Sequence, residues 1–331
     1  MKYSMKEFKI KFVVLLGMLI ASNACSYHFE VDEMKNTPKL VLYAFPGNQD
    51  TTWIQISESM PVGKKAYGLV GRPDASVTCH VNGQVKEVKR TDASDPGVAA
   101  GRYYLLGKFT AGDQVTFSAE APGLPAVSSQ TKVPETFPLK TVRLVKKLNP
   151  EGAGAMIQFQ ITFQDNGATT DYYGVRIERM EERWDENGSF EEIHNYSVNA
   201  INLGLEEEPL LKQGSLDEVF FEYEGAYKGL YVFPDTQIQN REYTLHLNTY
   251  FSENYESEYG SYWYHYYYRI TLFNLSPEYY SYVKHLIDQQ NNHLGDSGLS
   301  PIRPSYTNVV GGLGIVGGYM MYQSDWFENL K

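Results

Sequence analysis

The clearest pattern in the sequence is the stretch Ile157-Gln158-Phe159-Gln160-Ile161-Thr162-Phe163, in which apolar and polar residues alternate without a fault. Side chains of a β-strand point alternately to the two faces of a sheet, so this stretch predicts a strand with one buried and one polar side. Residues 173–177 and 243–247 repeat the pattern, and Asp185 to Gly188 has the composition of a hairpin loop. Several strands with turns between them predict a sandwich or barrel.

Short alternating segments also fill residues 39–136, and the expected strands there span 40–45, 52–57, 75–81, 84–88, 103–109 and 114–119. Asn82-Gly83 joins two of them, because these residues accept the positive φ angles of a type I′ hairpin turn. A β region of this length predicts an immunoglobulin-like or transthyretin-like sandwich. Four prolines from Pro122 to Pro138 interrupt strand pairing, so we expect a boundary there and a second β domain at residues 137–331.

One helix is predicted near the C-terminus, at about residues 277–292. Ser276 is a good N-cap, Pro277 suits the first helical position, and Glu278 lies at the positive end of the helix dipole. The expected fold class is therefore mainly β, with two sandwich-like domains of which the second carries one helix. Beyond the helix, the glycines of residues 311–318 are too frequent for an ordinary strand, and they predict bends or close backbone approach.

Composition narrows the function classes. Lys and Arg number 29 against 40 Asp and Glu, which gives a net charge of −11, and no basic stripe is present. A nucleic-acid partner is therefore not expected, because binding phosphates needs clustered positive charge. Tyrosine is abundant, with 27 residues of which 15 follow residue 240, whereas the chain has only 2 Cys.

The first residues have the pattern of an export signal. Four lysines precede an apolar run from Phe12 to Ala21, which is too short to span a membrane, and Ala24-Cys25 follows it. A small residue before Cys at this place is typical of bacterial lipoprotein signals, so residues 1–24 are expected to be removed and Cys25 to carry the lipid. The alternative is an ordinary secretory signal cut near Ala24. Residues 25–38 then form a lipidated tether, and Cys79 is expected to be a small buried residue.

The tyrosine-rich tract at residues 262–273 contains the candidate contact residues. Its even positions form an apolar face that we expect in the core: Tyr262, Tyr264, Tyr266, Tyr268, Ile270 and Leu272. The odd positions combine aromatic rings with polar tips and a guanidinium, which suits sugars, peptides or a partner protein. The candidate ligand or partner contacts are Trp263, His265, Tyr267, Arg269 and, in the preceding segment, Tyr255 and Tyr259. The alternative is that these tyrosines are only strand formers.

Several segments resemble a Bacteroidota lipoprotein family, the domain of unknown function family 4249. They are the lipoprotein-like start, residues 38–45, residues 275–280 and residues 307–319, of which the stretch Asn308-x-x-Gly-Gly-Leu-Gly314 is the most specific. The resemblance covers nearly the whole chain after Cys25. It implies a surface or outer-membrane lipoprotein that works with a TonB-dependent outer-membrane barrel in nutrient capture, because such proteins are commonly encoded beside these transporters. It implies no catalytic residues.

Other motifs predict no chemistry. Gly295-Asp296-Ser297-Gly298 resembles a serine-protease tetrad, but no matching base segment is recognisable, so a turn after the helix is the preferred interpretation. Glu206-Glu207-Glu208 is interpreted as a solvated loop, and the histidines lack ligand spacing, so no metal is expected. No cofactor is expected either.

The resulting hypothesis is a non-enzymatic capture or lid subunit of a TonB-dependent transporter, anchored by its lipid to the outer membrane, on the cell surface or on the periplasmic face. The first alternative is a surface adhesin or structural protein, and the second is a hydrolase that uses Ser297. Carbohydrate or peptide binding that depends on Trp263 and Tyr267 would favour the capture role over adhesion.

Overall fold

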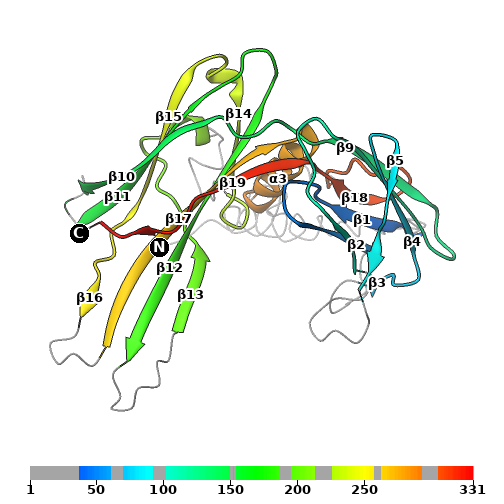
Figure 1. Cartoon of the computed structure of the whole chain (residues 1–331), viewed down its shortest axis with the longest axis horizontal. Coiled ribbons are helices and arrows are strands. Elements are labelled where there is room, and N and C mark those ends of the chain that lie inside the picture. The colour runs from blue at the N-terminus through cyan, green and yellow to red at the C-terminus, as the bar shows by residue number, and fades with distance from the viewer. Residues whose placement is uncertain are drawn as a thin grey trace, which may run out of the picture. The chain divides into compact units, whose positions relative to one another are not determined.

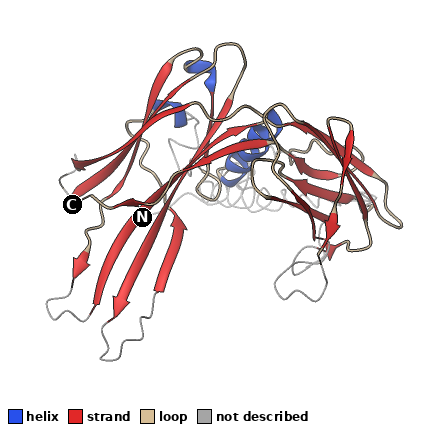
Figure 2. Cartoon of the chain, viewed as in Figure 1, coloured by secondary structure: helices blue, strands red, loops and turns tan. Residues whose placement is uncertain are grey.

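The computed structural model describes residues 37–60, 70–91, 102–149, 152, 154–185, 195–212, 226–256, 262–292 and 305–330. Strands dominate these residues, as Figure 2 shows, and they form several sheets with one α-helix near the C-terminus of the described part. The expected mainly β fold class, with a sandwich-like architecture, is confirmed.

The alternating segments before residue 136 form two sheets (Figure 1). The first contains β1 (Leu40–Ala44), β2 (Thr51–Glu58), β3 (Val70–Gly71), β6 (Lys89–Arg90) and β7 (Arg102–Leu106), and the second contains β4 (Ser76–Val81), β5 (Gln84–Lys86), β8 (Gln114–Glu120) and β9 (Val127–Lys132). Leu42, Ile54 and Phe117 are fully buried in one core that both sheets share. Asn82 and Gly83 have φ angles of 51° and 81°, which confirms the predicted hairpin turn between β4 and β5.

A strand from the C-terminal segment completes the first sheet. This differs from the expectation that a domain boundary between residues 136 and 137 separates the two β regions. Strand β18 (Leu313–Val316) pairs in parallel with β1, and Val309, Val316 and Met320 lie in the N-terminal core. Local alternation does not predict this pairing, because β1 and β18 are far apart in the sequence and Gly314 interrupts the alternating pattern of β18.

Close backbone approach explains the glycines of this segment, as predicted. Gly314 has a φ of 108°, and a Cβ built on it would lie 2.1 Å from the carbonyl oxygen of Leu42. A Cβ on Gly312 would lie 2.4 Å from the carbonyl oxygen of Leu40. Any larger residue would therefore push β18 away from β1.

The remaining strands form two further sheets. The three-stranded sheet contains β10 (Leu139–Leu148), β11 (Ala155–Gln164) and β15 (Glu242–Tyr250). The larger sheet contains β12 (Tyr172–Asp185), β13 (Asn195–Ala200), β14 (Tyr231–Pro234), β16 (Tyr255–Glu256), β17 (Tyr262–Leu275), β19 (Tyr319–Gln323) and β20 (Phe327–Glu328). Phe159 and Tyr268, one from each sheet, are fully buried with their ring centroids 5.4 Å apart.

Helix α3 (Pro277–Gln290) confirms the predicted helix and ends two residues earlier than expected. The Ser276 hydroxyl accepts a hydrogen bond from the Tyr279 N–H at 3.3 Å, as the N-cap assignment requires. Val283 and Ile287 are buried against Phe273 and Leu275, on the face of β17 opposite to Tyr268. Both faces of the last part of β17 are therefore covered.

Pro38–Met60 and the described residues from Val70 onward fall within one unit. Two short 3-10 helices, η1 (Pro209–Leu211) and η2 (Asp235–Gln237), lie in connections of the C-terminal half. Among the described residues, no helix has the length and apolar character needed to cross a membrane.

Candidate functional site

Strand β17 brings three of the predicted contact residues to one face. His265, Tyr267 and Arg269 are two residues apart, so they point to the same side. The pairing of β17 with β12 places Glu182, Met180 and Glu178 directly opposite them. We call these six residues the β17 face. All three β17 residues are half-buried.

On the β17 face, the charge of Arg269 is paired with that of Glu178. The Nε and a terminal nitrogen of Arg269 donate to one oxygen of Glu178, at 2.9 Å and 2.7 Å. The Arg269 guanidinium also lies over the ring of Trp326, 4.5 Å from its centroid. The Tyr267 hydroxyl bonds to Glu182, and burial together with this carboxylate raises the pKa of Tyr267. The face can therefore offer ring surface and hydrogen bonds, whereas Arg269 is committed to Glu178.

The other predicted contact residues are separated from this face or lie outside the described part. Tyr255 is 50% exposed on β16, but it pairs opposite Tyr264, and cross-strand partners share a side, so it lies on the even face. The backbone of Trp263 belongs to β17, while its side chain is outside the described residues. Tyr259 and Cys25 are also outside them, as are the Ser297 tetrad and the predicted loop after Asp185.

The even face of β17 follows the prediction in its last half. Tyr268, Ile270 and Leu272 are fully buried, whereas Tyr264 and Tyr266 are half-buried. Phe273 is also buried, although it is an odd residue, because α3 covers that side. Periodicity identified the core face, but it could not show that a helix covers part of the other face.

Sequence reasoning missed a polar surface on the three-stranded sheet. Cross-strand partners share a face, so Gln158 lies beside Asn248, Gln160 beside His246, and Thr162 beside Thr244. The opposite side of β11 is fully buried, at Ile157, Phe159, Ile161 and Phe163. We call the polar side the outer face. The amides and hydroxyls at alternate positions of residues 157–163 and 242–250 were the signal that could have found it.

The interpretation of residues 206–208 as a solvated loop is wrong for Glu208. This side chain is fully buried, and its carboxylate accepts hydrogen bonds from the Tyr243 hydroxyl at 2.9 Å, the His246 N–H at 2.9 Å and the Leu210 N–H at 3.2 Å. Burial raises the pKa of Glu208. Because β15 supplies two of these donors, Glu208 fixes the loop of residues 202–212 to the three-stranded sheet.

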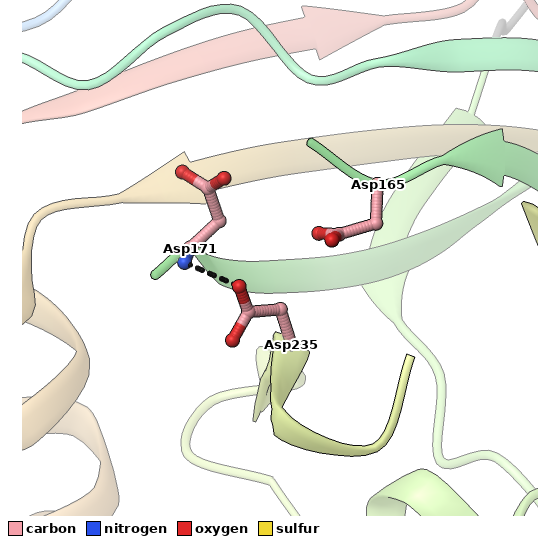
Figure 3. Close-up of side chains that lie close together, drawn as sticks. All are labelled: Asp165, Asp171 and Asp235. Atoms are coloured by element: carbon pink, nitrogen blue, oxygen red, sulfur yellow. Dashed lines mark hydrogen bonds between the residues drawn. The ribbon is translucent and has the colours of Figure 1, made fainter. Parts of the chain in front are cut away.

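Three aspartates gather where strands of the two C-terminal sheets end (Figure 3). Asp165 follows β11, Asp171 precedes β12, and Asp235 begins η2 after β14. Each offers a carboxylate oxygen, and these oxygens lie within 4.8 Å of one another. Carboxylate oxygens are the ligands that hard divalent cations such as Ca²⁺ bind.

The aspartates also hold neighbouring segments together through hydrogen bonds. Asp165 accepts hydrogen bonds from the Tyr173 hydroxyl and the Asn240 N–H, both at 2.7 Å, and Asp235 accepts one from the Asp171 N–H at 2.9 Å. Burial, followed by the charges of Asp165 and Asp171, raises the pKa of Asp235. These bonds join the strand ends, which explains the cluster without a metal. The expectation that the protein needs no metal stays a prediction.

Cys79 is fully buried, and burial raises the pKa of its thiol to about 12. The thiol is therefore protonated at neutral pH, and the thiol form is a much weaker nucleophile than the thiolate. This agrees with its interpretation as a small core residue.

Comparison with known proteins places the chain in a family. A search of curated proteins found no match. The family model described as Domain of unknown function (DUF4249) matches residues 26–324, which is nearly the whole chain and includes the described strands of all four sheets up to β19. The chain therefore belongs to the DUF4249 family.

Proposed function

We propose that this protein is a lipid-anchored outer-membrane lipoprotein and a non-enzymatic capture or lid subunit of a TonB-dependent transporter in nutrient uptake. The observation that carries the proposal is membership of the DUF4249 family over residues 26–324. The predicted export signal and Cys25 add support, because together they suit a bacterial lipoprotein.

The β17 face is the proposed contact surface with the barrel. Half-buried His265 and Tyr267 offer rings with polar tips, which are favoured in interfaces because one side chain supplies both apolar area and a hydrogen bond. The Arg269–Glu178 pair, with Arg269 stacked on Trp326, lies beside these rings on the same face. A surface that is already ordered loses little conformational entropy when a partner binds.

Co-purification tests this proposal. Native membranes would be extracted in mild detergent, the protein recovered by a C-terminal tag, and stoichiometric companions identified by mass spectrometry. We expect a TonB-dependent barrel in the wild-type sample and at least tenfold less of it with His265→Ala or Tyr267→Ala, equivalent to about 1.4 kcal/mol. Tyr322→Ala is the matched control, because Tyr322 is 43% exposed on the same sheet but pairs opposite the even residue Leu272.

Recovery of the protein alone, under conditions that preserve known barrel complexes, would contradict the transporter role and favour adhesion. Co-purification that is unchanged in both β17 variants would keep the role but reject the β17 face as the contact surface.

A further inference from the structure

The outer face of the three-stranded sheet carries a cavity that the proposed barrel contact does not use. Its volume is about 310 Å³, and its walls include Tyr250, Met156, Asn202, Asn248, Glu206 and Glu207. Ligand pockets for small molecules begin at about 300 Å³. The cavity is therefore large enough for a small organic ligand and much larger than a bare metal ion needs.

The loop that forms one wall is held in place by several bonds. Gly204 exchanges backbone hydrogen bonds with Asn248, at 2.8 Å and 3.2 Å, and the Leu203 N–H donates to the Tyr231 hydroxyl at 2.7 Å. Glu208 anchors the far side of the loop through Tyr243 and the His246 N–H. A ligand would thus meet a preformed wall and would not have to order it.

Asn248 and Glu207, which line the cavity, belong to a connected polar network that continues behind its wall. The Gln158 amide donates to Glu207 at 3.0 Å and to Asn248 at 3.1 Å, and Gln158 and Asn248 are each only 2% exposed. Lys147 donates to both oxygens of Glu207 at 2.8 Å, and this bond, with that from Gln158, lowers the pKa of Glu207. The network fixes the direction of the Asn248 amide and neutralises one of the two carboxylates.

Three exposed side chains of the cavity wall remain to receive a ligand: Glu206, Tyr250 and Asn202, whose amide can donate. Glu206 is exposed beside Gly204, and its acceptor oxygens suit hydroxyl donors. Tyr250 is 70% exposed at the last position of β15, where the pairing register places it beside Met156. An exposed ring next to an apolar side chain provides a flat platform for the C–H face of a sugar ring.

From this combination we infer that the cavity is a binding site for a neutral saccharide. Sugar hydroxyls both donate and accept, which matches carboxylate acceptors and amide donors around one aromatic platform. An anionic ligand would face Glu206 in a chain of net charge −11, so the same groups disfavour it. The site lies apart from the β17 face, and the inference does not depend on a barrel partner.

A second cavity on the outer face offers an extension. Its volume is about 550 Å³, and it is lined by Arg143, Gln160, Thr162, Thr244 and His246 among other polar residues. Gln160 joins the wall of this cavity to the polar network behind the first one, because its amide donates to the Gln158 side chain at 2.9 Å. A saccharide that starts at Tyr250 and is long enough to pass beyond the buried Gln158–Asn248 pair would reach this cavity, so longer saccharides should bind more tightly than single sugars.

Binding can be measured with the purified full chain in a detergent that has no sugar headgroup. The probes are glucose, galactose and mannose, their di- and trisaccharides, glucuronate as an anion and spermidine as a cation, each followed by calorimetry and saturation-transfer NMR. We expect a neutral saccharide to bind, with Tyr250→Ala weakening it at least tenfold and Tyr322→Ala leaving it unchanged. Arg143→Ala should weaken the trisaccharide about threefold and leave the single sugar unaffected.

The Glu206→Gln variant distinguishes binding of a neutral sugar from binding of a cationic amine. The amide keeps an acceptor oxygen, so a neutral saccharide should lose no more than about fivefold, whereas a cation would lose most of its affinity with the charge. Binding of only glucuronate or spermidine, the absence of any neutral saccharide bound at millimolar concentration, or binding that Tyr250→Ala does not change would each overturn the inference. Barrel co-purification with Tyr250→Ala protein is expected to be normal, so failure here and failure of the proposed function are distinguishable.

Discussion

Asp235 illustrates how a single buried carboxylate can set a pH response. It is 1% exposed, and its pKa is raised first by burial and then by the charges of Asp165 and Asp171. In an unfolded chain the group would titrate near its ordinary value of about 3.9. Between that value and the raised pKa, the folded protein binds more protons than the unfolded chain. This stabilisation is fully present below the unfolded pKa and is lost as pH rises through the folded pKa.

Asp235→Asn should therefore flatten the decline in stability above about pH 4. Asparagine keeps an acceptor oxygen for the Asp171 N–H but removes the buried charge, so the free energy of unfolding at pH 7 should increase by about 1 kcal/mol. Urea unfolding at several pH values from 4 to 7 measures this. Asp50→Asn, a change at an 89% exposed side chain, is the control and should keep the wild-type slope. Equal slopes in wild type and Asp235→Asn would contradict the argument.

Residue patterns in the sequence identified local features but not this cluster. Asn82-Gly83 and the Ser276 cap were predictable because both act within a few residues. Asp165, Asp171 and Asp235 meet only because β11 and β14 end where β12 begins, which no local pattern encodes. Glu208 was misjudged for the same reason, since its hydrogen-bond donors on β15 are more than 30 residues away.

At the scale of the element, β18 packs against β1 through close backbone contact as well as through its buried side chains Ile315 and Val316. Gly314 has a φ of 108° and approaches Leu42 so closely that a Cβ would lie 2.1 Å from its carbonyl oxygen. Gly107 has a nearly equal φ of 104°, with nothing within 4 Å of its Cβ position. The two glycines therefore have a similar positive φ, but only at Gly314 would a Cβ meet a neighbouring strand.

Comparing Gly314→Ala with Gly107→Ala should separate the cost of a positive φ angle from the cost of the close contact between β18 and β1. Alanine at Gly107 is expected to cost about 1–2 kcal/mol, which is the cost of left-handed backbone for an L-residue. Alanine at Gly314 adds the displacement of β18 from β1, so its total cost should reach about 3 kcal/mol or more. Denaturant unfolding of both variants provides the comparison. Equal losses would mean that β18 adapts to the added methyl group and that the close approach is not needed for stability.

Elements with strong periodicity were the most predictable. The alternation at residues 157–163 predicted β11 and its buried face. The N-cap and the apolar residues at helical spacing in residues 277–292 predicted α3. The parallel pairing of β18 with β1 was not predicted, because strand pairing between distant segments leaves no local periodicity. The outer face was missed for a different reason. The polar residues of each strand were interpreted separately as its solvent-exposed side, so the surface that β11 and β15 form together was not recognised.

At the scale of the whole molecule, the saccharide site and the proposed barrel contact use different surfaces. The outer face belongs to the three-stranded sheet, and the β17 face belongs to the larger sheet. The buried residues between the two sheets form one core, so each sheet can present a polar surface on its other side. A capture subunit needs this separation, since it must hold cargo and contact a transporter at once.

The membrane anchor is the last element of the proposed function, and Cys25→Ser tests it. Without the thiol no lipid can be attached, and each buried methylene of an acyl chain contributes about 0.8 kcal/mol to membrane binding. We expect wild-type protein in the membrane pellet and Cys25→Ser protein in the soluble fraction, as measured by immunoblotting of fractionated cells. Cys79→Ala, which changes a buried core thiol, is the control and should stay in the pellet. Wild-type protein in the soluble fraction would instead support an ordinary secretory signal. It would also contradict the proposal that a lipid anchors the protein to the membrane.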